Sequence, residues 1–483
     1  MTKKITIEPV TRVEGHGKVT VHLDEKGNVT QSRLHIVEFR GFERFIQGRP
    51  FWEAPVLVQR LCGICPVSHH LAASKAMDAI VGVTPETISP TAEKMRRLMH
   101  YGQIFQSHAL HFFHLASPDL LFGIDAEPAR RNVIALAMEN KELASQGILM
   151  RQFGQEVIEA TAGKKIHGTG AIPGGINKAL DPQDKDRFLN GADPLNAAKM
   201  VDWAEDALNF FLDYHKKNKE FIDNFAAFPS NHLSIVRKDG ALDLYHGVLR
   251  AVDTAGNKIL HDIDYNTYLD FIGEEVKSWS YMKFPFLKNK GKKEGWYRVG
   301  PLARLNTADF IPSPRAQKAF EAYKAYTNGK PNNMSMHMHW ARLIETLHAA
   351  EMIETLLQDP EILEGELIRE GKRQSEGIGL LEAPRGTLFH HYQVDDNDLI
   401  SMANLIVSTT NNNEPMNQAV HLVAKEYLEG QKEITEAMLN AVEVAIRAYD
   451  PCLSCATHAM GKMPLKVTLL DASDKMLDEK LKN

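Results

Sequence analysis

All four cysteines of this 483-residue chain fall into two C-x-x-C pairs, one near each end of the sequence. The first pair is Cys62 and Cys65, and the second is Cys452 and Cys455. Two intervening residues let both sulfur atoms of a pair turn toward one centre, so each pair can offer two ligands to the same metal. Because nearly the whole chain separates the pairs, only a fold that brings its two ends together can form a four-thiolate site. We predict such a site.

Other interpretations of these cysteines remain open at this point. A structural zinc site also uses four thiolates, and spacing alone favours it. A thioredoxin-type dithiol or a disulfide would explain one pair and leave the other unexplained. However, zinc normally stabilises small domains with poor cores, whereas 43% of this long chain is hydrophobic. The ionisable neighbours Arg60, His69, Asp450 and His458 also favour a chemically active metal.

Composition excludes several classes of function. The formal net charge of −6, with 24% charged residues, provides no basic field for nucleic acid or anionic lipid. We expect no membrane span, because there is no apolar run of 18 residues, and the N-terminus lacks a secretory signal. Four cysteines are too few for a disulfide scaffold, which fits a reducing, cytoplasmic location. No linker or internal repeat divides the chain, so we expect one globular unit.

Sequence periodicity predicts an α+β fold that is mainly helical, with a long central helix bundle and small antiparallel β-sheets at the periphery. An alternating pattern predicts a hairpin over residues 5–37, and short strands over 233–263 suggest a surface insertion. Apolar spacing predicts long helices at four places, and Pro451 ends the last of them. These helices are expected after Ser89–Pro90, over residues 193–225, over 334–359 and over 434–449.

The cysteine stretches carry a resemblance to a known family. Arg60 to Cys65 with His69, and Asp450 to Cys455 with His458, resemble the two signature motifs of nickel-iron hydrogenase large subunits. The similarity extends through most of the chain, and the motif sequences are most like those of the large subunit of soluble, NAD-reducing hydrogenases. Its other motifs are R-V-E-G-H at 12–16, F-R-G-F-E at 39–43, G-P-L-A-R at 300–304 and E-A-P-R-G at 382–386.

The resemblance implies a nickel held by all four thiolates. Cys62 and Cys452 would be terminal ligands, while Cys65 and Cys455 would bridge to an iron that carries cyanide and carbonyl ligands. Soft sulfur ligands suit both metals. His69 would steady a bridging sulfur.

The implied reaction is the reversible, heterolytic cleavage of H2 to protons and electrons. The thiolate of Cys452 and then Glu14 would take the proton, which a carboxyl group can relay if burial raises its pKa. Arg385 would direct its guanidinium at the open side of the metals, where a fixed charge can polarise the bond being broken. One departure from the family is Ser107, because many members have an aspartate there.

The same helix carries His108, His111 and His114 at intervals of three residues. This spacing could suggest a second metal, but core positions are the simpler interpretation.

The resemblance also implies a magnesium site and a processed C-terminus. Glu43 and His458 would bind the magnesium together with a backbone carbonyl and water. A maturation protease would cut after His458, so residues 1–458 would form the working unit and 459–483 would be removed. Residues 465–469 alternate between apolar and polar side chains, as the residues of a β-strand do.

Electrons must leave through other chains. No cysteine remains for an iron-sulfur cluster and no G-x-G-x-x-G occurs, so iron-sulfur clusters, FMN and NAD are expected only on partners. These partners would be diaphorase subunits together with a small hydrogenase subunit. The alternatives are a non-enzymatic scaffold with a structural four-cysteine zinc site, and a hydrogenase of this family with another electron acceptor.

Overall fold

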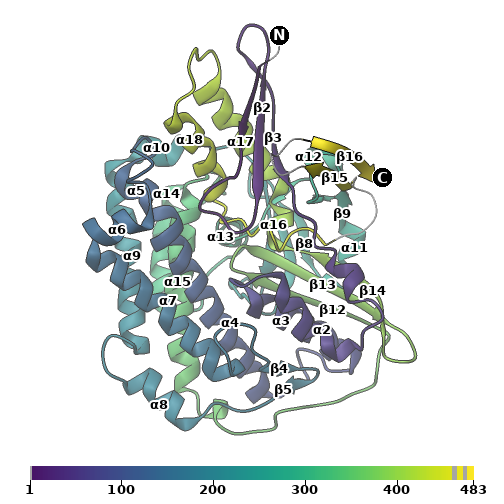
Figure 1. Ribbon diagram of the computed structural model, residues 1–483. Helices are drawn as coiled ribbons and strands as arrows, with labels where there is room; N and C mark the ends of the chain where they lie inside the picture. The colour runs from purple at the N-terminus through teal and green to yellow at the C-terminus, as the bar shows by residue number, and fades with distance from the viewer. Residues whose placement is uncertain (1–2, 459–464, 471–475, 483) are drawn as a thin grey trace.

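The computed structural model describes residues 3–458, 465–470 and 476–482. Four of the five long helices pack together in the half of the molecule shown at the left of Figure 1, with α4 against α7 and α15, and α15 against α9, while α3 packs against β12 and β13. They confirm the predicted helix bundle and the α+β class. The long helices are α3 (Pro66–Ile80), α4 (Pro90–Leu110), α7 (Lys141–Ala162), α9 (Ala197–Lys217) and α15 (His337–Gln358).

Helix α4 begins where the sequence predicts it. Ser89 is its N-cap and accepts a hydrogen bond from the backbone N–H of Ala92, while Pro90 occupies the first helical position. The predicted helix over residues 193–225 was wrong in its length. Asn218 interrupts it after α9, and a short helix α10 (Lys219–Asn224) follows.

Three antiparallel strands form the sheet near the N-terminus, which projects at the top of Figure 1. They are β1 (Lys3–Ile7), β2 (Gly17–Leu23) and β3 (Val29–Ile36), and they confirm the predicted hairpin with one added strand. The loop between β1 and β2 carries Glu14. Because this loop returns toward the centre of the protein, the N-terminal sheet places that residue beside the second cysteine pair.

A second sheet has the order β11-β6-β7-β8. Its strands are β6 (Asn231–Val236), β7 (Val248–Val252), β8 (Lys258–Ile263) and β11 (Tyr297–Arg298). The predicted surface insertion is wrong for β6, because every residue of this strand is buried. The strand contacts the third sheet, β12 (Glu376–Ala383), β13 (Gly386–Val394) and β14 (Ile400–Ile406), whose first two strands are almost entirely buried and turn at Arg385.

The last expected helix is α18 (Glu436–Arg447), and the cysteine-containing stretch follows it directly. Strand β15 (Leu465–Leu470) contains the strand predicted over 465–469. The remaining elements are short, and their bounds are α1 (Phe42–Phe45), η1 (Phe51–Glu53), α2 (Ala54–Leu57), η2 (Val58–Leu61), η3 (His111–Ala116, a π-helix), α5 (Ser117–Phe122), α6 (Val133–Glu139), β4 (Ala171–Ile172), β5 (Gly175–Ile176), α8 (Pro182–Asn190), η4 (Tyr265–Thr267), α11 (Tyr268–Phe271), β9 (Ile272–Glu275), β10 (Phe284–Leu287), α12 (Gly291–Glu294), α13 (Pro301–Thr307), α14 (Pro314–Tyr326), η5 (Pro360–Ile362), α16 (Ser408–Asn411), α17 (Asn413–Leu428) and β16 (Met476–Lys482).

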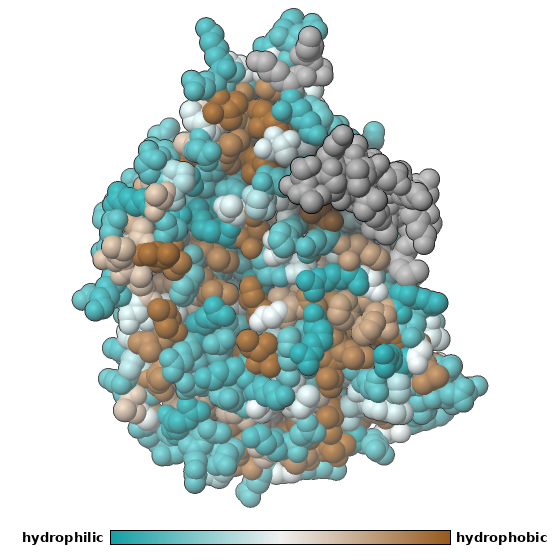
Figure 2. All heavy atoms as spheres, in the orientation of Figure 1, coloured by the Kyte–Doolittle hydropathy of each residue, from teal (hydrophilic) through white to brown (hydrophobic). Residues whose placement is uncertain are grey.

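The surface carries hydrophobic residues dispersed among hydrophilic ones on the face that Figure 2 shows. Within the described residues, no helix has both the length and the hydrophobicity that crossing a membrane requires.

Candidate metal centre

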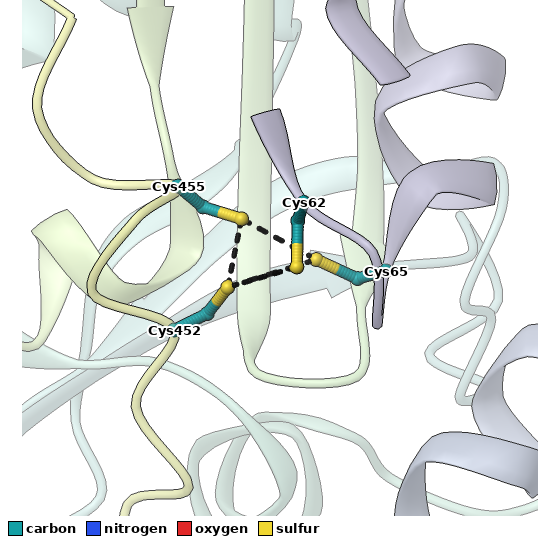
Figure 3. Close-up of side chains that lie close together, drawn as sticks. All are labelled: Cys62, Cys65, Cys452 and Cys455. Carbon is teal, nitrogen blue, oxygen red and sulfur yellow. Dashed lines mark hydrogen bonds between the residues drawn. The ribbon is translucent and has the colours of Figure 1, made fainter. Parts of the chain in front are cut away.

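The fold brings the two cysteine pairs together in its interior. Figure 3 shows the four sulfur atoms pointing toward one another, two from the segment before α3 and two from the stretch after α18. The Sγ atom of Cys452 lies 3.3 Å from that of Cys62 and 2.7 Å from that of Cys455, and 3.6 Å separates the Sγ atoms of Cys65 and Cys455. All four are free, buried thiols, so they form one tetradentate sulfur site.

Local structure turns each pair inward. Cys62 is extended and follows η2 directly, while Cys65 stands immediately before α3, with Pro66 at the first helical position. Asp450 adopts a left-handed backbone conformation (φ 51°), which ends the helical path after α18 and redirects the chain. The backbone N–H of Cys452 then donates to the Thr409 side-chain oxygen at 2.9 Å.

The thiols affect one another's protonation. Hydrogen bonds from the other three cysteines lower the pKa of Cys62 well below its usual value. Burial raises the pKa values of Cys452 and Cys455 well above theirs. The cluster therefore supports one thiolate readily and resists further ionisation, because several anions in a buried site repel one another. A bound metal cation would remove that penalty and displace the remaining protons.

Glu14 lies against the second cysteine pair. Its carboxylate oxygen Oε2 accepts hydrogen bonds from the Cys452 thiol at 3.0 Å and from the Ser454 backbone N–H at 3.1 Å. The Leu453 N–H donates to the Glu14 carbonyl at 2.9 Å, so the two segments pair as a short parallel bridge. Gly15 allows this approach, because a Cβ atom there would lie 2.7 Å from the Ser454 nitrogen.

Glu14 is also poised between the cluster and the exterior. Its side chain is partly buried, and this burial, together with a negative charge on Cys62, raises its pKa. Its loop is anchored by Arg12, which pairs with Asp119 at 2.5 Å. His16 lies on the surface instead, where its ring contacts Glu38 at 2.7 Å.

Arg385 lines a pocket together with Cys65, Cys452 and Cys455. Its Nη2 group pairs with the Asp450 carboxylate at 3.0 Å, and its Nε–H donates to the Asp450 carbonyl oxygen at 2.5 Å. Its Nη1 group donates to the Ser107 hydroxyl at 3.3 Å. Although burial opposes it, the negative charges of Asp450 and the cysteines raise the pKa of Arg385, which keeps it cationic. Ser107, the position at which the sequence departs from the expected aspartate, therefore binds this guanidinium.

A small pocket of about 10 Å³, room for roughly one water-sized molecule, adjoins the cysteines. It is lined by the sulfur-bearing Cys65, Cys452 and Cys455 and by the side chains of His69 and Arg385. Its polar lining is restricted to a few groups, so a small, apolar molecule fits it.

His69 is buried beside this pocket, and burial lowers its pKa to about 4. Its Nδ1 atom is 3.1 Å from Nε2 of His390, whose Nδ1 atom lies 2.6 Å from the Tyr392 hydroxyl. The sequence analysis missed this row of three rings. Alternate residues of β13 provide two of the rings, but nothing in the local pattern indicates their contact with α3.

Glu43 and His458 come from segments that the fold joins. The N–H groups of Arg40 and Gly41 donate to the Thr457 carbonyl oxygen at 3.1 and 3.3 Å. The His458 ring lies edge-on to Phe42, with centroids 5.7 Å apart. Glu43 is buried, accepts a hydrogen bond from the Leu405 N–H at 2.9 Å and has a pKa raised by burial. His458 contacts the Cys455 carbonyl oxygen, and no hydrogen bond among the described residues joins it directly to Glu43.

The three histidines of α4 and η3 do not converge on a second metal. His108 Nε2 lies 3.0 Å from the Glu345 carboxylate, while His111 Nε2 lies 2.8 Å from the Arg447 carbonyl oxygen. A different group of potential ligands, which the sequence analysis missed, brings together three helices. It consists of His215, Asp223 and His337.

Comparison with known proteins identifies the family. The HoxL-like profile matches residues 4–39, and the nickel-dependent hydrogenase profile matches residues 40–153 and 243–458. The chain belongs to the nickel-dependent hydrogenase family. It is 51% identical to the NAD-reducing hydrogenase HoxS subunit beta of Cupriavidus necator, over 99% of this chain and all of that protein. It is 42% identical to a chain of the F420-non-reducing hydrogenase of Methanothermobacter thermautotrophicus, covering 96% of this chain and 97% of that one.

A solved NAD+-reducing nickel-iron hydrogenase, in its H2-reduced state, has the same fold. Its chain superposes with a TM-score of 0.90 at 55% identity, covering 94% of this chain and 99% of that one. The chain is therefore the catalytic component of a nickel-iron hydrogenase, and the zinc-scaffold interpretation is set aside. The site fits a nickel centre, because four buried, convergent sulfur atoms form a soft donor set.

Proposed function

We propose that this hydrogenase chain cleaves H2 heterolytically and reversibly at a nickel-iron centre, with electrons passing to NAD through partner chains. The observation that carries this proposal is the convergence of four thiols with a carboxylate, Glu14 Oε2, only 3.0 Å from the Cys452 sulfur. When bound, the metal centre supplies the cleavage of the H–H bond. The protein supplies the ligands, a proton acceptor and a fixed positive charge.

The cysteines have two roles in this proposal. Cys62 and Cys452 hold nickel as terminal ligands, and Cys65 and Cys455 hold nickel and iron together. Cyanide and carbonyl complete the iron coordination. The pocket beside these sulfur atoms, with its few polar groups, supports their assignment because it offers a diatomic ligand or substrate a mainly apolar site. The row of rings that begins at His69 holds the wall of this pocket in place.

Glu14 receives the proton from the Cys452 sulfur. The hydrogen bond between these groups needs no intervening water, which supports direct transfer. Burial raises the pKa of Glu14, which makes its carboxylate a better proton acceptor than that of an exposed glutamate. The partly exposed position of its loop gives the proton a route outward.

Arg385 acts from the wall of the pocket. Its guanidinium is fixed by Asp450 and stays charged, so it can polarise H2 in the pocket without reorganising. Because Asp450 neutralises part of this charge, the arginine can lie beside a metal centre without expelling the cation.

Glu43 and His458 bind magnesium in this proposal. Support comes from the backbone hydrogen bonds that hold residue 457 against residues 40 and 41. Removal of residues 459–483 after His458 would complete this site. The cleavage site and the next few residues lie outside the described part of the chain.

Electrons leave through a small subunit with iron-sulfur clusters and through FMN- and NAD-binding subunits in the cytoplasm. The higher identity to a relative named NAD-reducing, 51% against 42% for one named F420-non-reducing, favours NAD over another acceptor.

The test is to purify the complex and measure its metals and its hydrogen-dependent reduction of NAD. We expect nickel together with a larger amount of iron, because the iron-sulfur clusters of the partner subunits contribute iron as well, and NAD reduction that Cys455→Ser abolishes. Zinc alone would refute the metal assignment. Hydrogen oxidation with an artificial dye but not with NAD would refute only the acceptor.

A further inference from the structure

The sequence motif that ends in Arg304 has no part in the site as described so far. The structure joins it to the motif that surrounds Arg385. Arg385 is one of the two residues in the tight turn between β12 and β13, where Ala383 pairs with Gly386. The segment that begins α13 packs directly against this turn.

Glycine permits the close packing of these two segments. Gly300 has a φ of +96°, and a Cβ atom there would lie 2.9 Å from the Arg385 carbonyl oxygen. Gly386 has a φ of +133°, and a Cβ atom there would lie 2.3 Å from the Val299 side chain. Both conformations and both contacts exclude larger residues.

Arg304 then fixes the turn through hydrogen bonds. Its Nη1 group donates to the Ala383 carbonyl oxygen at 2.9 Å, and its Nη2 group donates to that of Pro384 at 3.3 Å. These are the two carbonyl groups that immediately precede Arg385. The position of the catalytic guanidinium therefore depends on the backbone that Arg304 holds.

The remaining N–H groups of Arg304 bind two buried carboxylates. Nε and Nη2 pair with Glu345 at 2.6 and 2.5 Å, and Nη1 pairs with Glu382 at 2.8 Å. Glu382 in turn accepts from the Thr387 hydroxyl at 2.7 Å, and Glu345 contacts His108 at 3.0 Å. The carboxylates hold Arg304 in place and balance its charge.

We propose that Arg304 is the positioning residue for Arg385, a role that rests on the proposed function of Arg385 in cleaving H2. All five N–H groups of the guanidinium are used, two on the turn and three on the carboxylates. Lysine has only three donors and no planar fork, so it cannot replace these bonds. The arginine acts through the backbone of the turn and not on the substrate.

The test compares Arg304→Lys with Arg96→Lys in the intact complex. Arg96 is an equally buried arginine that binds the Asp78 carboxylate and the carbonyls of Ile172 and Gly175. It precedes Ser107 on α4 by eleven residues, which is about 16 Å along a helix. It therefore controls for the loss of a buried arginine without disturbing the turn.

We expect Arg304→Lys to keep its nickel and iron while kcat for hydrogen oxidation falls on the order of 100-fold at unchanged KM. Arg96→Lys should keep the wild-type kcat. Hydrogen–deuterium exchange of backbone amides over residues 383–388 should speed up only in Arg304→Lys. Because Arg304 acts through Arg385, the double variant Arg304→Lys/Arg385→Lys should be no slower than Arg385→Lys alone.

Each contrary result has its own meaning. Wild-type activity in Arg385→Lys would refute the proposed role of Arg385. If Arg385→Lys is slow, wild-type kcat in Arg304→Lys would overturn the inference alone, and so would additive losses in the double variant.

If Arg304→Lys does not fold, Gly300→Ala replaces it, with Gly329→Ala as the control. Both glycines have positive φ, but a Cβ at Gly329 meets nothing within 4 Å. Loss of kcat with metals retained in Gly300→Ala, and not in Gly329→Ala, supports positioning of the turn. Equal activity in both variants would contradict it.

Discussion

Replacing Glu14 by glutamine removes the ionisable carboxyl group while preserving the shape of the side chain. The carboxylate accepts hydrogen bonds from the Cys452 thiol and from the backbone N–H and hydroxyl of Ser454. A glutamine oxygen in the place of Oε2 can still accept from the Ser454 N–H and face the sulfur, while the amide nitrogen faces the Ser454 hydroxyl, which can accept from it. We therefore expect Glu14→Gln to fold and to retain nickel and iron.

The predicted loss is in proton transfer. Because Glu14 Oε2 lies at direct hydrogen-bond distance from the sulfur, the relay has the geometry of general acid–base catalysis, which contributes about 10² to 10⁴ in rate. This corresponds to about 2.7–5.5 kcal/mol in the activation free energy. Hydrogen oxidation and the exchange of D2 with water protons should both fall by such a factor.

The assay follows HD and H2 release from D2 by mass spectrometry, at equal nickel content of wild type and variant. Glu14→Asp is the matched control. Its carboxylate is one methylene shorter and must reach the sulfur through water, so it should retain intermediate activity. Wild-type exchange in Glu14→Gln with full metal content would refute the relay.

Three further predictions test other parts of the account. Cys65→Ser should lose nickel retention and activity together, because a hard alkoxide is a poor bridge between soft metals, and metal analysis beside hydrogen oxidation checks this. The intact mass of active, nickel-containing protein should lack residues 459–483, and a fully active chain that retains them would contradict processing. Burial lowers the pKa of Lys75 from 10.5 to about 7 in the folded protein. Between pH 7 and pH 10.5 the unfolded chain therefore binds more protons at Lys75 than the folded protein does, so the free energy of unfolding should rise with pH over this range. Thermal melting at pH 7 and pH 9 should show a larger rise in Tm for wild type than for Lys75→Met.

Local signals predicted much of the fold. The Ser89–Pro90 cap, the alternation in β2 and Pro451 each act within a few residues, so their effect is visible in sequence. The two C-x-x-C pairs predicted a long-range contact for a different reason, because a four-thiolate metal site requires that the four thiols meet. The family resemblance added the candidate roles of Glu14 and Arg385, which no local pattern contains.

Other features depend on tertiary contacts and could not be predicted in this way. Strand β6 has the sequence of an ordinary short strand, and its contacts with α13, β12 and β13 make it buried. The interruption between α9 and α10 occurs at Asn218, where no proline or glycine marks the end of a helix. Arg304 and Glu345 are 41 positions apart, and the sequence gives no sign that both bind beside the turn at Arg385.

The central claim is that four cysteines hold a nickel-iron centre whose iron carries carbonyl and cyanide. Infrared spectroscopy of the purified complex tests it most directly, because these diatomic ligands absorb where protein groups do not. We predict carbonyl and cyanide bands in the wild type that are absent from Cys455→Ser. A nickel-containing, active wild-type enzyme without such bands would contradict the account.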